Sequence, residues 1–150
     1  MQTVAAVNDA TARARLSGPA VRAYLKLASL WALDTEEQID LLGASVSRGT
    51  LRNWALGKTE AMLSADQLMR ISFLLGIYEG LQRIWRRAPA EADLWLRRSR
   101  SEGPFRGLAP IAYMRQGGIP ALSATRSYVD GMTAGPPSRT EYVSPPREEI

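Results

Sequence analysis

The side chains best suited to chemistry in this sequence lie in the run "VSRGTLRNW", residues 46–54. Arg48, Arg52 and Asn53 follow at helical spacing, and Gly49 is small enough to let another molecule approach closely. Arginine can pair with guanine or with a phosphate, and asparagine with adenine. The spacing therefore predicts a helix whose exposed face reads DNA. The residues expected to contact DNA are Ser47, Arg48, Gly49, Arg52, Asn53 and Lys58.

The same run carries the features that would hold such a helix in place. Ser47 can cap the first turn, and Val46, Leu51 and Trp54 can face inward. This pattern is typical of the second half of a helix-turn-helix, in which the second helix enters the major groove. One position departs from the pattern, because the turn normally has glycine just before the Val-Ser pair and this chain has Ser45. The alternative is a three-helix lobe in which Leu51 and Trp54 only fill a core.

The composition limits the chemistry that the chain can do. It has 150 residues with no cysteine and no histidine, which excludes disulfides, Cys or His zinc sites, a Ser-His triad and a thiol nucleophile. We see no glycine-rich phosphate loop or metal cluster, and we therefore expect neither a cofactor nor enzymatic activity. The net charge of +4 favours an acidic partner, with nucleic acid as the first candidate. Because long apolar runs and a signal-peptide pattern are missing, we expect a cytoplasmic protein.

Helical periodicity recurs along the chain, whereas the alternation typical of strands does not, and this predicts an all-α fold. Ser17-Gly-Pro19 is a helix-start signal, and the segments 35–38 and 64–67 both fit capping boxes. Proline at the start and glycine at the end mark the later helices. The expected helices cover residues 19–32, 35–43, 48–57, 65–88, 90–99, 110–116 and 120–133.

The longest expected helix, 65–88, carries apolar side chains on more than one face. Such a helix is typically buried on two sides, and we expect it to join an N-terminal lobe to a C-terminal one. Residues 136–150, "PPSRTEYVSPPREEI", contain four prolines, which predicts a tail that is extended or disordered when alone. The expected divisions are a flexible N-terminus (1–16), a helix-turn-helix lobe (17–75), a second helical domain (76–135) and the tail (136–150).

The second half of the chain has further candidate contacts. Its candidate core or interface anchors are Trp95, Pro110, Met114 and Leu122. Its basic cluster, which is either a solvated face or a contact for an acidic partner or a phosphate, is Arg97, Arg98, Arg100 and Arg106. In the tail, Tyr142 and Val143 are apolar residues flanked by prolines. This tail is either a frayed terminus or a segment that folds into a partner's cleft on binding.

From the long helix onward, an ordered set of residues resembles the antitoxin family known as Xre/MbcA/ParS, whose members are partners of toxins with a RES domain. The matching residues are Leu63-Ser64 through Gln67, Arg70-Ile71, Leu75-Gly76-Ile77-Tyr78, Ala92, Trp95-Leu96, Phe105-Arg106-Gly107, Pro110, Met114, Gly117, Arg126 and Tyr128-Val129-Asp130. The resemblance covers about residues 35–135.

This resemblance implies an Xre-like helix-turn-helix lobe joined to a toxin-binding domain. It implies an antitoxin that silences a RES toxin, an enzyme class that consumes NAD, by occluding the active site with its C-terminal region. It also implies that the complex represses its own operon. The expected toxin contacts are Arg106, Met114, Arg126, Tyr128, Tyr142 and Val143. The expected partners are this toxin and operator DNA, with the chain acting as a homodimer or as a hetero-oligomer with the toxin. The alternative is a stand-alone regulator whose C-terminal half serves oligomerisation or ligand sensing.

Overall fold

The computed structural model describes residues 10–60 and 62–133, and the regular secondary structure in these residues is entirely helical. The helices are α2 (Ala10–Leu30), α3 (Thr35–Leu41), α4 (Arg48–Ala55), α5 (Ala65–Ile84), α6 (Pro89–Trp95) and α7 (Pro110–Thr133). The predicted all-α fold is confirmed. Within this part of the chain, no helix is both long and apolar enough to cross a membrane.

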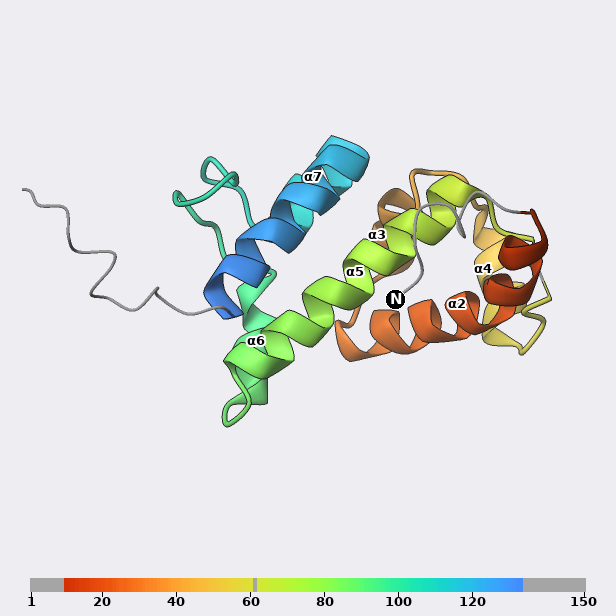
Figure 1. The fold of residues 1–150 in the computed structure, drawn as a ribbon, viewed down its shortest axis with the longest axis horizontal. Helices are drawn as coiled ribbons and strands as arrows, with labels where there is room; N and C mark the ends of the chain where they lie inside the picture. The colour runs from red at the N-terminus through yellow and green to blue at the C-terminus, as the bar shows by residue number, and fades with distance from the viewer. Residues whose placement is uncertain (1–9, 61, 134–150) are drawn as a thin grey trace, which may run out of the picture.

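Helix α5 is the axis of the molecule. Figure 1 shows α2 on one side of α5 and α7 on the other, with α3 and α4 near its first half and α6 at its far end. Side chains on several faces of α5 are buried, and Leu74, Ile77 and Leu81 are completely inaccessible. The buried side chains of both lobes form one continuous cluster. The prediction that the helix near residues 65–88 joins the two lobes is confirmed, but α5, with 20 residues, is shorter than α2, with 21, and is not the longest helix.

Helices α5 and α7 approach each other closely because α5 has glycine at two positions one turn apart. A Cβ atom at Gly80 would lie 2.5 Å from Cγ1 of Val129, which is fully buried. A Cβ atom at Gly76 would overlap the guanidinium group of Arg126. Gly80 is therefore required by the packing of the two helices, whereas a side chain at Gly76 would have to displace the guanidinium group of Arg126.

Helix α7 consists of two helical parts that meet at a kink. Gly118 has φ 66° and ψ −154°, a conformation that is not helical and that favours glycine. Pro120 follows, and its missing N–H cannot continue the hydrogen bonds of the first part. The predicted helices 110–116 and 120–133 correspond to the two parts of α7.

Helix α2 begins earlier than predicted, at Ala10, and it runs through Pro19 without ending. The hydroxyl of Ser17 does not cap a helix start, because it is buried and already bonded on both sides. It donates to the carbonyl four residues earlier at 2.6 Å and accepts from the N–H of Leu63 at 2.9 Å. The residues 10–16, which we expected in a flexible N-terminus, are therefore the first turns of α2.

The start of α3 is capped one residue earlier than predicted. The carboxylate of Asp34 accepts from the N–H of Glu37 at 2.8 Å, and the carboxylate of Glu37 accepts from the N–H of Asp34 at 3.0 Å. This capping box replaces the expected pair of Thr35 and Gln38, because the Gln38 side chain donates to the carbonyl of Leu33 instead. The correction shifts the cap and leaves the helix where the sequence placed it.

The other predicted caps are confirmed, but α2, α3 and α4 end two residues earlier than predicted, and α5 and α6 end four residues earlier. Ser47 caps α4, and Ser64 forms a reciprocal capping box with Gln67 at the start of α5. Helix α5 ends at Ile84 rather than at residue 88, and α6 ends at Trp95 rather than at residue 99. No glycine stands at either of these ends, so the C-terminal glycine signal that marks other helices of the chain is missing there.

Candidate nucleic-acid interface and partner-binding surface

Helix α4 is held in place by buried apolar side chains and by its cap. Leu51 and Trp54 are 6% and 4% exposed, and Val46 packs against the same core. The hydroxyl of Ser47 accepts from the N–H of Thr50 at 3.0 Å, which satisfies one free donor of the first turn. The predicted inward residues and cap of this helix are confirmed, and they turn the opposite side of α4 toward solvent.

The solvent side of α4 is polar and carries positive charge. Five of the predicted DNA contacts are exposed and the sixth, Gly49, is half-buried; they lie on α4 or at its two ends as Ser47, Arg48, Gly49, Arg52, Asn53 and Lys58. Arg48 forms an ion pair with Glu36 of α3. Arg52 and Lys58 form no ion pair with any residue that the structure describes. An approaching phosphate would therefore meet two uncompensated cations and one that is shared with Glu36.

The turn between α3 and α4 explains why serine can replace the usual glycine. The positive φ angles lie at Gly43 (77°) and Ala44 (57°), so position 45 needs no glycine. The hydroxyl of Ser45 donates to the carbonyl of Leu42 at 2.6 Å and accepts from Nε2 of Gln67 at 2.8 Å. Ser45 therefore ties the turn to α5 and keeps the two helices of the motif in a defined arrangement.

In the C-terminal domain, aromatic rings gather around the loop between α6 and α7. The ring of Phe105 is fully buried and lies 5.7 Å from that of Trp95, 5.3 Å from that of Tyr128 and 5.4 Å from that of Tyr113. Burial raises the pKa of Tyr128, and the nearby carboxylate of Glu102 adds to the rise. Tyr128, a predicted toxin contact, is half-buried in this cluster, where it supports the loop.

Met114 was expected to contact the toxin, and its burial contradicts this. Its side chain is 1% exposed and belongs to the core. Trp95 and Leu122 are likewise buried at 2% and 0%, which confirms the packing interpretation of both. Burial follows from the apolar face of α7 being turned toward α5, so Met114 can shape a partner surface only from beneath.

The remaining predicted toxin contacts differ in exposure. Arg126 is half-buried over Gly76, with Nε 3.4 Å from Oδ2 of Asp130. Arg106 is exposed at the surface of the loop. Tyr142 and Val143, together with the tail, lie outside the described residues. Of the six, the structure therefore places Arg106 at an open surface and Arg126 and Tyr128 at a partly covered one.

The predicted basic cluster is largely used within the fold. Arg97 makes two hydrogen bonds to the carboxylate of Glu37, at 2.8 and 3.1 Å. Arg98 pairs with Glu91 at 3.5 Å, and the guanidinium of Arg100 lies 4.8 Å from the centre of the Trp95 ring. The interpretation of this cluster as one solvated or partner-binding face therefore holds for Arg106 but not for Arg97.

Two ion pairs that local sequence did not predict join the lobes. Arg97, just after α6, bonds Glu37 of α3 and the carbonyls of residues 31 and 32, at 3.1 and 3.2 Å. Arg115 of α7 donates from Nε to Oδ2 of Asp40 at 2.9 Å. Both contacts hold α3, the first helix of the motif, against the C-terminal domain. The partners are 60 and 75 residues apart, so no local spacing signals them.

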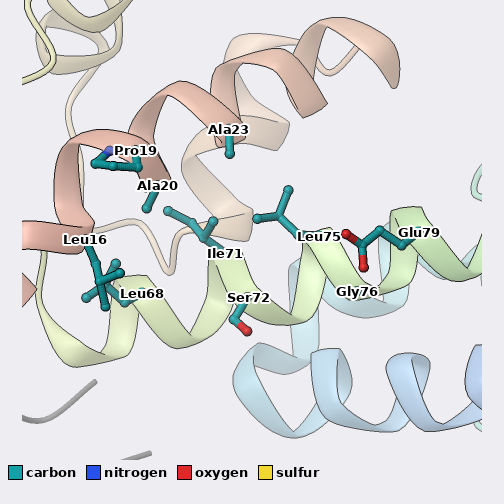
Figure 2. Close-up of a pocket in the computed structure, with 10 residues that line it drawn as sticks. All are labelled: Leu16, Pro19, Ala20, Ala23, Leu68, Ile71, Ser72, Leu75, Gly76 and Glu79. Carbon is teal, nitrogen blue, oxygen red and sulfur yellow. The ribbon is translucent and has the colours of Figure 1, made fainter. Parts of the chain in front are cut away.

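A groove of about 450 Å³ lies between α2 and α5. Figure 2 shows its walls, with Leu16 and Ala20 on α2 and Leu68 and Leu75 on α5. The lining is mainly apolar, and Glu79 stands at one end of it. The sequence assigned no role to this groove, because its residues share no motif.

Across residues 10–60 and 62–133, no three His, Cys, Asp or Glu side chains gather as a metal site would require.

Comparison with known proteins agrees with this geometry. The profile of the antitoxin Xre-like helix-turn-helix domain matches residues 10–76, which span α2 to α4 and the first part of α5. The chain is 33% identical over 115 residues to the uncharacterized protein y4oB of Sinorhizobium fredii, a match that covers 77% of this chain and 84% of that protein. No solved structure matches the chain significantly. The chain therefore belongs to the family of proteins that carry the antitoxin Xre-like helix-turn-helix domain.

Proposed function

We propose that this protein is an antitoxin that binds and inhibits a RES-domain toxin, an enzyme class that consumes NAD, and that represses its own operon through α4. The observation that carries the proposal is that α5 joins two different surfaces, the exposed face of α4 and the loop between α6 and α7. Helix α4 turns a capped, basic face outward at one end of the molecule, and the loop between α6 and α7 lies at the other (Figure 1). A chain built only to read DNA does not need the second surface.

The proposal predicts that a RES-domain protein is encoded beside this gene, and co-expression with that protein is the direct test. We expect the two proteins to co-purify, and we expect this chain to restore growth to cells that express the toxin. The proposal fails if the chain neither co-purifies with the toxin nor rescues growth.

The DNA-binding part is tested by changing Arg48 and Arg52 to alanine together. Both side chains are exposed on α4, so the fold should persist while operator affinity falls. The slope of log affinity against log salt concentration should become shallower by about 2, because two phosphate contacts are lost. Arg83→Ala with Arg87→Ala removes the same charge from the far end of α5 and serves as the control. Mobility shifts with DNA from upstream of the gene provide the measurement. Equal binding by the α4 variant and the wild type would remove α4 from the interface, and toxin neutralisation should be unchanged in both variants.

The tail is the segment that we propose to occlude the toxin's active site. A stop codon at Pro136 should impair neutralisation and leave helical circular dichroism almost unchanged, since the described helices end at Thr133. Growth rescue by the shortened and the full chain is the comparison. Full protection by the shortened chain would show that the folded domain alone inhibits the toxin.

DNA binding is proposed to need a dimer or a larger complex with the toxin. A single helix reads a short half-site, and pairs of such helices typically contact half-sites one helical turn apart, about 10 base pairs. An operator with two such half-sites would match this arrangement, and footprinting of the operator measures their spacing.

The second candidate function is a stand-alone regulator that senses a small ligand. The observation in its favour is the apolar groove between α2 and α5, whose volume of about 450 Å³ lies within the range of small-molecule sites. This function predicts operator binding that responds to a ligand and no effect on toxin activity. Neutralisation of the toxin in the co-expression test would exclude it as the main function.

A further inference from the structure

The turn at residues 105–108 holds an arginine in a backbone conformation that arginine rarely adopts. Arg106 has φ 52° and Gly107 has φ 89°, and the N–H of Leu108 donates to the carbonyl of Phe105 at 3.0 Å. Positive φ at both central residues is characteristic of a type I′ turn, in which asparagine, aspartate or glycine is normally found. The Cβ of an L-residue is unfavourable there. Arg106 therefore occupies a position that Asn would fill with less strain.

The surrounding contacts hold this turn in place. Phe105 is fully buried among aromatic rings, and the N–H of Gly107 donates to the carbonyl of Arg100 at 2.7 Å. The N–H of Arg100 in turn donates to the carbonyl of Leu108 at 3.1 Å. Strained residues persist only where their surroundings over-determine them, and they gather at functional sites. The loop thus presents the Arg106 side chain from a rigid base.

Arg106 also differs from its neighbours in charge compensation. Arg97, Arg98 and Arg100 each pair with a carboxylate, whereas Arg106 is exposed and forms no ion pair with any residue in the described ranges. Two other non-glycine residues in those ranges have positive φ, Ala32 and Ala44, but each follows a helix end, where a left-handed residue closes the last turn. Arg106 has no such local explanation.

We propose that Arg106 is the anchor of the toxin interface and that its guanidinium pairs with a carboxylate on the toxin surface. This inference rests on the proposed antitoxin function and names the chemistry of its contact. Arginine in a fixed loop suits such a contact, because its planar fork binds a carboxylate through two parallel hydrogen bonds and loses less side-chain freedom per hydrogen bond than lysine does. Arginine is also enriched among the residues that dominate protein interfaces.

The test is the affinity of the full chain for the co-expressed RES-domain toxin. Arg106→Asn keeps the turn and removes the charge, so we expect at least about tenfold weaker binding, together with a Tm that is unchanged or higher by roughly 2–4 °C. Arg106→Lys keeps the charge without the fork and should bind with intermediate affinity. The wild-type affinity should also fall more steeply with salt than that of Arg106→Asn, because one ion pair has been lost.

Two control variants separate this contact from general effects. Arg87→Asn makes the same chemical change at an exposed arginine on another surface, and Ala44→Asn relieves the same backbone conformation elsewhere. Both should bind the toxin as the wild type does. If Arg106→Asn binds the toxin with wild-type affinity, the inference is overturned. It is also overturned if Arg106→Asn loses operator binding and keeps toxin binding. A wild-type chain that does not bind the toxin overturns the proposed function and this inference with it.

Discussion

Two glycines of the helix-turn-helix, Gly43 and Gly49, occupy their positions for different physical reasons. Gly43 has φ 77°, and a Cβ atom there would lie 2.7 Å from Cζ of Arg70, so both backbone and packing require it. Gly49 lies in the first turn of α4, where a Cβ atom would meet only the hydroxyl of Ser47, at 3.7 Å. The fold therefore leaves room for a side chain at Gly49, which agrees with the proposal that DNA approaches α4 closely at this residue.

Gly49→Ala should raise stability and weaken DNA binding. Alanine loses less backbone freedom than glycine in a helix, so we expect the free energy of unfolding to rise by about 0.5–1 kcal/mol. The added methyl group would stand on the DNA-facing side, so we expect weaker operator binding in a mobility-shift assay. Chemical denaturation measures the first effect. A variant that is more stable and binds the operator normally would show that the small size of Gly49 does not serve DNA binding.

At the level of helices, the contact between α5 and α7 depends on the absence of side chains at Gly76 and Gly80. The Val129 side chain is fully buried in the space above Gly80. Branching at Cβ leaves valine few alternative rotamers in a helix, so it cannot move aside easily. The arginine above Gly76 is longer and more flexible, and we therefore expect Gly80 to be the more sensitive of the two positions.

Gly80→Ala should destabilise the protein by about 1–3 kcal/mol, because the new methyl group would force α5 and α7 apart. Gly131→Ala is the matched control, since Gly131 is also in a helix but a Cβ atom there meets nothing within 4 Å. We expect the control to be neutral or slightly stabilising. Urea denaturation of both variants gives the comparison, and equal stabilities would argue against a tight crossing at Gly80.

At the level of the whole molecule, the lobes are joined by a charged contact as well as by the shared core. The carboxylate of Glu37 is buried, caps α3 and pairs with Arg97 from the C-terminal domain. The hydrogen bonds from Arg97 hold the pKa of Glu37 below its ordinary value of 4.5, against the opposing effect of burial. This contact ties the orientation of the helix-turn-helix to the rest of the fold.

The depressed pKa of Glu37 predicts a pH-dependent contribution to stability. A carboxyl group with a lower pKa in the folded state stabilises the fold above its unfolded pKa, and this stabilisation is lost as the pH falls through the folded pKa. Glu37→Gln should therefore lower the free energy of unfolding by about 1–3 kcal/mol at pH 7, given that Arg97 is partly exposed. The difference from the wild type should shrink as the pH falls below 4.5.

Glu36→Gln is the control for this prediction, because the neighbouring ion pair of Glu36 with Arg48 is exposed to solvent. We expect that variant to change stability by less than about 1 kcal/mol at either pH. Thermal or urea unfolding between pH 3 and pH 7 is the measurement. A difference between wild type and Glu37→Gln that stays constant over this range would show that the charge of Glu37 does not provide the stabilisation.

The sequence by itself determined the features that depend on neighbours within about one helical turn. The all-helical fold, the caps at Ser47 and Ser64, and the inward direction of Leu51 and Trp54 were predictable, because caps and apolar spacing act between residues a few positions apart. The same local reasoning failed at Ser17, whose hydroxyl is bonded within α2 and to a residue 46 positions away.

Only the tertiary structure decided which distant residues meet. It brought Arg97 to Glu37 across 60 positions, buried Met114 beneath the surface that it was expected to form, and gave Arg106 a positive φ. The physical reason is that these outcomes depend on how helices pack and on how a loop closes over its aromatic core. Residue types and local spacing specify the helices, but the partners of a side chain across the molecule are specified by the packing of the whole chain.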